Sequence, residues 1–370
     1  SVKLTGVKPV YRLKTKEGYE LRLTADHKVF TTNGKKEAQN LKVGDKLMLS
    51  TGGYFGLNGS LNEGRVLGWL VGDGSVKKDV ATLYFYQEEK RELAPQFALM
   101  VDKMVGQEGV TQRAYPVAPQ YIEKENNAVI ESVRLWRIAS RYGITHGNKY
   151  QIPSEILGGS EEFQRGFLQG LFSSDGGVFG TIEKGVSVRL TSINLDLLKK
   201  AQVLLLNFGI FSKIYLNRRL EGKRFLPDGK GGSREYNCLA YHELVISKQS
   251  LIKFSALIGF LQEKKQEKLQ SLLALYNRGP YSEPSTAKFV SLEKEGEEEV
   301  FDITVADIHK FSANGIVVSN CGEEGLPPWG VCNLGSINLS ALVHGKGIDK
   351  KGTFDFKELK RVIKGGVRFQ

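Results

Sequence analysis

Two stretches of the sequence, VLGWLVGDGSV (residues 66–76) and FLQGLFSSDGGV (residues 167–178), share a pattern of small residues that ends in an acid. In each stretch small residues stand four positions apart, so they lie on one face if the stretch is a helix. An aspartate follows, Asp73 or Asp175, and then a glycine of the kind that ends helices. Small residues let two backbones approach closely. We therefore predict two helices that lie side by side and bring Asp73 and Asp175 together.

A second similarity follows each stretch, because LWRIASR (residues 135–141) resembles ELVISKQ (residues 243–249). A unit of about a hundred residues is thus repeated in tandem. Such a repeat predicts one domain made of two halves that are related by a pseudo-twofold axis. Helical and strand patterns alternate within both halves, so we expect a mixed fold of helices and strands.

Strand-like segments flank the repeat on both sides. Residues 1–50 alternate apolar and polar side chains around a turn at Lys16–Gly18, which indicates a β-hairpin. The β character returns in EEEVFDITVADIHKFSANGIVVSN (residues 297–320), and a third composition begins at Cys321. We therefore predict a β-rich unit that is split by the inserted repeat and followed by a tail of different origin.

The overall charge favours a polyanionic partner. The 370 residues include 52 Lys and Arg against 41 Asp and Glu, a formal net charge of +11. Nucleic-acid-binding proteins often have such a balance, although lysines that only keep a protein soluble give the same value. No apolar run approaches the roughly 20 residues of a membrane helix, so no membrane partner is expected. Three scattered cysteines are too few for a disulfide framework, which predicts an intracellular, cytoplasmic protein.

The two aspartates indicate a metal site. A carboxylate at a helix C-terminus is unfavourable by roughly 0.3–1 kcal/mol, because the helix dipole is negative there. Two facing carboxylates also repel each other, and a divalent cation would relieve both effects. Hard oxygen ligands suit Mg²⁺, which can activate water for attack on a phosphate. The alternative is two ordinary helix ends with solvated aspartates.

The paired motifs resemble the LAGLIDADG motifs of homing endonucleases, in particular of the type nested inside inteins. The resemblance covers about residues 60–278 and implies an αββαββα fold in each half, with two saddle-shaped sheets that grip double-stranded DNA. It implies a monomeric, site-specific nuclease with Asp73 and Asp175 as Mg²⁺ ligands. It also implies a lysine near the scissile phosphate, for which Lys248 is the candidate, although Arg141 stands at the aligned place in the first half. The basic residues that we expect to contact DNA are Arg218, Arg219, Lys223, Arg224, Lys230 and Arg234.

The flanking β segments resemble the two ends of the Hint splicing domain of inteins. LTADHKVFTT matches the Thr-x-x-His element with Thr24 and His27, which could polarise a scissile carbonyl and protonate a leaving amine. The segment that ends at residue 320 follows the C-terminal pattern of inteins. In that pattern Asp302 and His309 match positions that assist the later splicing steps.

The resemblance gives the Asn320–Cys321 pair a chemical role. The side-chain nitrogen of Asn320 would attack its own carbonyl carbon and cut the chain, and the thiol of Cys321 would accept the upstream segment. Two features depart from the family. Ser319 stands where a histidine is usual, and the first block with its nucleophile does not precede the Thr-x-x-His element. We therefore expect cleavage before Cys321 without complete splicing.

The tail CGEEGLPPWGVCNLGSINL (residues 321–339) resembles the active-site segment of the large catalytic subunit of ribonucleotide reductase. The resemblance makes Cys321 the thiyl-radical cysteine, Glu323 the nearby carboxylate and Cys332 one of the redox-active pair. The segment is too short to form the complete α/β barrel, so only a fragment of the host enzyme, an oxidoreductase, is expected.

Together these patterns predict an intein-derived protein that combines splicing chemistry with site-specific DNA cleavage and interrupts a ribonucleotide reductase. Two other interpretations stay open, a reductase fragment with an inactive insert and a DNA-binding protein without nuclease activity. The expected boundaries are 1–58 and 279–320 for the Hint unit, 59–278 for the endonuclease with halves at about 64–158 and 159–278, and 321–370 for the reductase segment.

Overall fold

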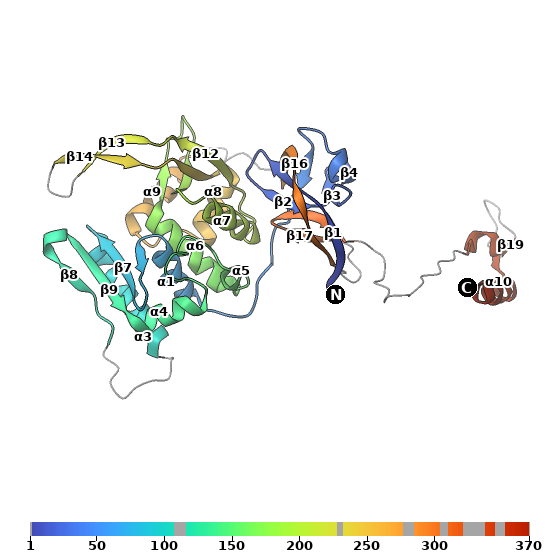
Figure 1. Ribbon diagram of the computed structural model, residues 1–370, viewed down its shortest axis with the longest axis horizontal. Helices are drawn as coiled ribbons and strands as arrows, with labels where there is room; N and C mark the ends of the chain where they lie inside the picture. Colours follow the sequence, from blue (N-terminus) through green and yellow to red (C-terminus); the bar gives the residue numbers. More distant parts are fainter. Residues whose placement is uncertain are drawn as a thin grey trace.

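The computed structural model describes residues 2–106, 116–227, 232–276, 285–303, 310–320, 337–344 and 352–369. Figure 1 shows a β-sheet unit built from residues 2–48 and 286–319, beside a larger domain of helices and sheets. None of the helices within these ranges has the length and apolar character needed to span a membrane.

One eight-stranded sheet takes its strands from two distant parts of the sequence. Its order is β17-β18-β3-β5-β16-β1-β2, with β4 paired to β3. We call this sheet the split β unit. Its core includes Leu13, Val29, Leu47 and Ile316, which are fully buried. The strands are β1 (Val2–Thr15), β2 (Glu20–Leu23), β3 (Lys28–Thr31), β4 (Gly34–Glu37), β5 (Lys46–Met48), β16 (Thr286–Ile303), β17 (Lys310–Ala313) and β18 (Ile316–Ser319).

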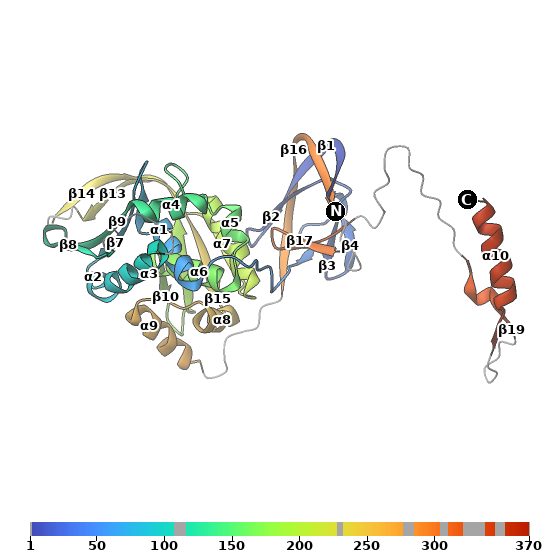
Figure 2. The ribbon, with the colours of Figure 1, turned by 90° about the horizontal axis from the view of Figure 1, so that it is seen from below.

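The longest pairing joins the two parts of this unit. β1 and β16 run antiparallel from the pair Val2↔Ile303 to the pair Thr15↔Phe289, with three register shifts between them. Figure 2 shows these two strands as neighbours, and the first residues of β16 pair with β5 instead. The predicted β-rich unit that is interrupted in sequence is therefore continuous in space.

The intervening residues form two halves with the same order of elements, which we call the repeat domain. The sheet of the first half has the order β6-β7-β9-β8, and that of the second half β10-β11-β15-β12. The first half contains α1 (Leu61–Val71), β6 (Gly74–Val76), β7 (Ala81–Tyr86), α2 (Glu89–Glu92), α3 (Ala94–Gly106), β8 (Gln120–Ile122), β9 (Asn127–Ser132), α4 (Val133–Arg141) and α5 (Ser154–Leu157). The second half contains α6 (Glu161–Asp175), β10 (Gly176–Phe179), β11 (Ser187–Ser192), α7 (Leu195–Asn207), β12 (Lys213–Arg219), β13 (Gly222–Pro227), β14 (Ser233–Cys238), β15 (Tyr241–Ser247), α8 (Gln249–Leu257) and α9 (Glu263–Ala274).

The shared order is αββαββα in each half, as the resemblance implies. One addition distinguishes the second half, because the hairpin β13–β14 is inserted between β12 and β15. The corresponding strands of the first half, β8 and β9, are joined through a short 3-10 turn at Glu123–Glu125. A single hydrophobic core runs through both halves.

Helices α1 and α6 lie against each other at the centre of the repeat domain (Figure 1). A Cβ added at Gly68 would lie 2.1 Å from a carbonyl oxygen of α6, and one added at Gly170 would lie 2.3 Å from a carbonyl oxygen of α1. Both distances are far below van der Waals contact, so only glycine allows this approach. Gly64 and Gly166 extend the same close contact by one turn. The small-residue pattern of the sequence thus sets the distance between the two halves.

The tail forms small elements of its own. They are a 3-10 turn (Leu339–Leu342), the paired strands β19 (Val343–His344) and β20 (Thr353–Phe354), and α10 (Phe356–Phe369).

Candidate functional sites

The first candidate site lies where α1 and α6 end. Ser60 starts α1 with a capping box, and the side chain of Ser160 caps α6 by accepting a hydrogen bond from the backbone N–H of Phe163. The helices then run in register to Asp73 and Asp175. A Cβ added at Gly72, next to Asp73, would lie 3.3 Å from Oδ2 of Asp175. The two aspartates are therefore neighbours across the helix pair, as the repeat predicts.

Two lysines accompany the aspartates. Lys149 Nζ donates to the carbonyl oxygen of Gly72 over 2.9 Å and also to that of Gly74. Lys265 Nζ donates to the carbonyl oxygens of Ser173 and Gly176 over 2.6 and 3.1 Å. Each lysine thus binds the backbone that carries the aspartate of one half. The two contacts are related by the pseudo-twofold symmetry.

The surroundings of Asp73 and Asp175 destabilise the ionised form of both carboxyl groups. The loss of surrounding water, followed by the charge of Asp73, raises the pKa of Asp175 to about 6. The loss of water also raises the pKa of Asp73, against the opposing charges of Lys265 and Lys149. Both carboxyls nevertheless remain accessible to solvent. Burial lowers the pKa of both lysines, and the carboxylates oppose this effect. An added cation would relieve the repulsion between the acids.

The lysines whose charges act on both aspartates are Lys149 and Lys265, and the role of Lys248 stays a prediction. Lys248 precedes α8 with a positive φ of 55°, and Arg141 is the last residue of α4. The alignment that paired them is wrong, because residues 135–141 belong to a helix whereas residues 243–247 belong to β15. Short apolar runs fit either structure, which explains the error. The ammonium groups beside the aspartates belong to Lys149 and Lys265, which the sequence analysis missed.

The predicted DNA-contacting residues divide between two places. Arg218 and Arg219 end β12, where Arg218 Nε lies 3.4 Å from Oε2 of Glu243. Arg189 of β11 pairs with the same carboxylate at 3.4 Å, so two arginines share one acid on this face of the β10-β11-β15-β12 sheet. Arg189 was not predicted from the sequence. Lys213 adds a third cation to this basic cluster, with its ammonium 4.6 Å from the ring of Tyr215.

The hairpin β13–β14 has two unlike faces. The register pairs Arg224 with Tyr236 and Leu226 with Arg234, so both arginines and the tyrosine share one face. Lys223 lies on the opposite face, where its Nζ is 3.2 Å from Oε2 of Glu235. One face is therefore positively charged and the other is neutralised.

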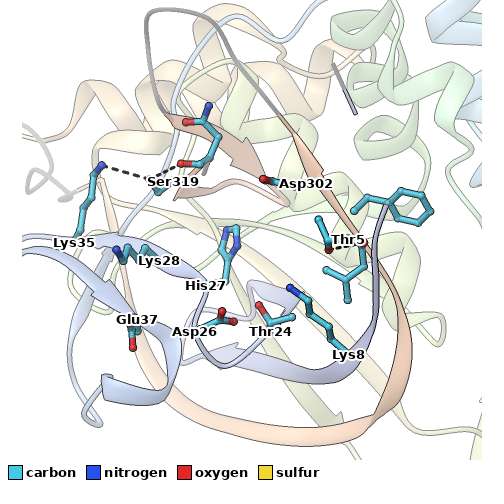
Figure 3. A pocket seen from close by; sticks show the side chains of 13 residues that line it. Thr5, Lys8, Thr24, Asp26, His27, Lys28, Lys35, Glu37, Asp302 and Ser319 are labelled. Atoms are coloured by element: carbon cyan, nitrogen blue, oxygen red, sulfur yellow. Dashed lines mark hydrogen bonds between the residues drawn. The ribbon is translucent and has the colours of Figure 1, made fainter. Parts of the chain in front are cut away.

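A second candidate site is a pocket of about 740 Å³ in the split β unit. Thr24, His27, Asp302 and Asn320 all line it, although they come from both ends of the sequence. Figure 3 shows His27 at the centre, with Asp302 on one side and Thr24 on the other. The β1–β16 pairing and the β3–β18 pairing bring the two segments together.

The groups in this pocket suit proton transfer. Burial lowers the pKa of His27, while Asp302 and Asp26 oppose the shift, so the imidazole is neutral at neutral pH. A hydrogen bond from Thr24 lowers the pKa of Asp26, which keeps that carboxylate ionised. Asn320 is only 4% exposed. A neutral imidazole that lines the same pocket as a buried asparagine can accept or donate a proton there.

Comparison with protein families identifies two parts of the chain. Residues 162–259 match the LAGLIDADG-like domain, and residues 300–370 match the barrel domain of ribonucleotide reductase. The chain is thus similar to a LAGLIDADG-like domain in one part and to the reductase barrel domain in another. The LAGLIDADG match includes Asp175, α7 and the hairpin β13–β14 of the second half.

Relatives of both parts are known. Ribonucleoside-diphosphate reductase NrdEB subunit alpha of Bacillus subtilis (strain 168) is 32% identical over 331 residues, which cover 85% of this chain and 30% of the relative. The replication factor C small subunit of Methanocaldococcus jannaschii is 28% identical over 270 residues, which cover 71% of this chain and 13% of the relative. The chain thus spans less than a third of the length of these relatives. Among solved structures, mesophilic variants of the homing endonuclease I-DmoI match with a TM-score of 0.38 and 16% identity, covering 57% of this chain and 97% of that one.

Five of the predicted site residues lie outside the described residues. They are Lys230, His309, Cys321, Glu323 and Cys332. Their assigned roles, and the domain boundaries, stay predictions.

Proposed function

We propose that the LAGLIDADG-like domain is a metal-dependent endonuclease that cuts double-stranded DNA at a specific site. The observation that carries this proposal is the pair Asp73 and Asp175, held together by glycine-packed helices and flanked by Lys149 and Lys265. The two carboxylates face solvent and repel each other, so they suit a cation and the phosphate oxygens that would complete its ligand shell.

Mg²⁺ fits these donors, since it is often held by one or two carboxylates with water and phosphate as further ligands. Asp73 and Asp175 would hold it, and it would supply Lewis-acid activation of the phosphate. Among the described residues no group of three or more His, Cys, Asp and Glu side chains could hold a metal by itself. A site of two carboxylates would therefore take its remaining ligands from water and from the DNA. Lys149 and Lys265 lie close enough to offset the negative charge that gathers there.

The direct experiment is cleavage of DNA that carries the uninterrupted reductase gene. The purified chain is incubated with Mg²⁺ and this DNA, and a single cut at the insertion point is expected. Tight, salt-sensitive binding without a cut would favour a DNA-binding protein instead. Neither binding nor cutting would favour a reductase fragment with an inactive insert.

We further propose that the split β unit is an intein splicing domain that cuts the chain before Cys321. The support is the shared pocket, in which His27, Asp302 and Asn320 lie together. In the proposed reaction the Asn320 side-chain nitrogen attacks its own carbonyl carbon, and the neutral imidazole of His27 assists proton transfer. After release, Cys321 would serve the reductase as its radical cysteine, with Glu323 and Cys332. A monomeric endonuclease and an intracellular, cytoplasmic location stay predictions.

The variety of the relatives supports an insert. A reductase and a replication factor have unrelated activities, yet each matches more than two thirds of this chain. A segment shared by unrelated host proteins is typical of an intein with its nested endonuclease. The match to the reductase barrel at residues 300–370 supports a ribonucleotide reductase as the host of this copy.

The two faces of the hairpin β13–β14 predict an asymmetric effect on DNA binding. Replacing Arg224 and Arg234 with Ala is expected to weaken binding about tenfold per arginine near 0.1 M salt. Each arginine removed is one phosphate contact fewer, so fewer counterions are released from the DNA on binding. The salt dependence should fall by about one unit of slope per arginine. Lys223→Ala is the matched control, since Lys223 is neutralised by Glu235 on the other face. Fluorescence anisotropy at several salt concentrations measures both quantities, and an equal loss in the control would contradict the assignment of the faces.

The raised pKa of Asp175 predicts a pH dependence. A proton and a metal ion compete for the same carboxylate, so the metal site forms only when Asp175 is ionised. At limiting Mg²⁺ the cleavage rate should be constant at higher pH and fall about tenfold per unit below pH 6, the region of the Asp175 pKa of about 6. Raising the Mg²⁺ concentration should move this fall to lower pH. A rate that does not change across this region would contradict a metal site that forms only when Asp175 ionises near pH 6.

A further inference from the structure

Ser319 stands immediately before the asparagine at which we propose that the chain is cut. It is the last residue of β18 and is 8% exposed. Its hydroxyl donates a hydrogen bond of 3.1 Å to the carbonyl oxygen of Asn320. The carbon of this carbonyl is the one that the asparagine side chain attacks during cyclisation. The hydroxyl therefore lies where negative charge develops in the transition state.

Lys35 of β4 completes this arrangement. Its Nζ donates to Oγ of Ser319 over 3.4 Å, and Figure 3 shows the bond at the edge of the pocket. β4 pairs with β3, and β3 pairs with β18, so the sheet brings Lys35 to Ser319 across 284 positions of sequence. A hydroxyl that accepts a hydrogen bond from an ammonium donates more strongly to its own acceptor.

We propose that Lys35 and Ser319 form a hydrogen-bonded relay that polarises the Asn320 carbonyl for cyclisation. Ser319 contacts the reacting carbonyl and is a catalytic residue, whereas Lys35 acts through it and is a positioning residue. The inference rests on the proposed cleavage after Asn320. It explains how the chain can perform this step with serine at the place where the related splicing domains usually have histidine.

The bond changes of the step are as follows. Nδ2 of Asn320 bonds to the carbonyl carbon of the same residue, and the carbonyl electron pair moves onto the oxygen that Ser319 holds. The oxygen then re-forms its double bond as the peptide bond to residue 321 breaks. The departing nitrogen takes up the proton that the attacking amide loses, and a C-terminal succinimide remains. No oxidant, reductant or metal is required.

The relay is tested first by the rate at which the full chain releases residues 321–370. Ser319→Ala removes an oxyanion donor and is expected to slow release by about 10²–10³-fold. Lys35→Met should slow it about tenfold, because the charge acts through one intervening hydroxyl. Ser319→Thr and Lys35→Arg keep the donors and should retain most of the rate. Ser312→Ala on β17 and Lys46→Met on β5 are the matched controls from the same sheet.

A second measurement reports the polarisation itself. Labelling asparagine with ¹³C at the carbonyl and cysteine with ¹⁵N selects only the two Asn–Cys bonds of the sequence, Asn237–Cys238 and Asn320–Cys321. In spectra recorded before cleavage proceeds, Ser319→Ala should move the Asn320 carbonyl signal upfield. Lys35→Met should move it part of the way, and the Asn237 signal should stay in place as an internal reference.

The outcomes separate the relay from the proposed function. An unchanged rate and carbonyl signal in Ser319→Ala overturn the relay, while a requirement for Asn320 would still support cleavage by cyclisation. Equal effects of Lys35→Met and Lys46→Met would also overturn the role of Lys35. Release that persists without the Asn320 side chain, or a wild-type chain that stays intact, overturns the proposed cleavage and the relay with it.

Discussion

The Asp73→Asn, Asp175→Asn double variant is expected to lose DNA cleavage by about a thousandfold or more while it still binds DNA. An amide has the shape of the carboxyl group but supplies no negative charge for a cation. Loss of metal activation removes several kcal/mol of transition-state stabilisation, which corresponds to this factor. The basic cluster with Arg189 and Lys213 and the arginines of the hairpin β13–β14 are untouched, so affinity for DNA should change little.

The same double variant should be as stable as the wild type at neutral pH, or more stable. Both aspartates have raised pKa values in the folded chain, so the folded state loses stability from these groups as the pH rises from the ordinary aspartate range to about 6. Neutral amides remove this cost, and the melting temperature at neutral pH should be unchanged or higher. A large fall in melting temperature would mean that lost cleavage reflects unfolding.

Asp79→Asn, at an exposed position after β6, is the control for the loss of one carboxylate. It should cut DNA at the wild-type rate in the presence of Mg²⁺. If the double variant also cuts at that rate, the two aspartates do not hold the metal, and the proposed active site is wrong.

Local patterns in the sequence were sufficient to predict the centre of the repeat domain. Glycines four positions apart specify how closely α1 and α6 can approach. The glycine after the aspartate follows the helix end only at Gly176, and there in an extended conformation, whereas α1 already ends at Val71 and Gly74 begins β6. These signals depend on a few neighbouring residues and survive the divergence of the two halves. The positions of Asp73 and Asp175 followed directly from them.

The flanking lysines could not be found in the same way. Lys265 stands among Lys264 and Lys268 on α9, and nothing in the local sequence distinguishes it from them. Lys149 follows α4 in an irregular segment. Only the folding of each half brings one lysine back to the carbonyl groups around its aspartate, so the three-dimensional arrangement decides their role. The one available signal was that each lysine follows the terminal helix of a αββαββα unit.

In the pocket of the split β unit, too, one residue could not be predicted from the local sequence. Thr24, His27, Asp302 and Asn320 were proposed from a resemblance, and the pairing of β1 with β16 and β3 with β18 brings them to one place. Lys35 was not foreseen, because its contact with Ser319 depends on the register of three strands. A one-residue shift in β4 would move its side chain to the other face.

The Asn320→Ala variant is expected to abolish release of residues 321–370. Alanine has no side-chain nucleophile, so the cyclisation step has no attacking atom. The chain should persist at its full mass of 41.1 kDa, whereas the wild-type chain should give a fragment of residues 1–320 that is one water lighter than a hydrolysis product. Intact mass spectrometry distinguishes a succinimide from hydrolysis by this difference.

Two further variants test whether release needs the Cys321 thiol and whether it is specific to Asn320. Cys321→Ala should still release the tail, because cyclisation needs the asparagine but not the thiol that accepts the upstream segment. Asn33→Ala, in the turn between β3 and β4, is the asparagine control and should behave as wild type. If the tail is still released from Asn320→Ala, another bond or another nucleophile is responsible. The pocket that joins the two ends of the split β unit would then need a different function, since its most deeply buried polar side chain would take no part in the cut.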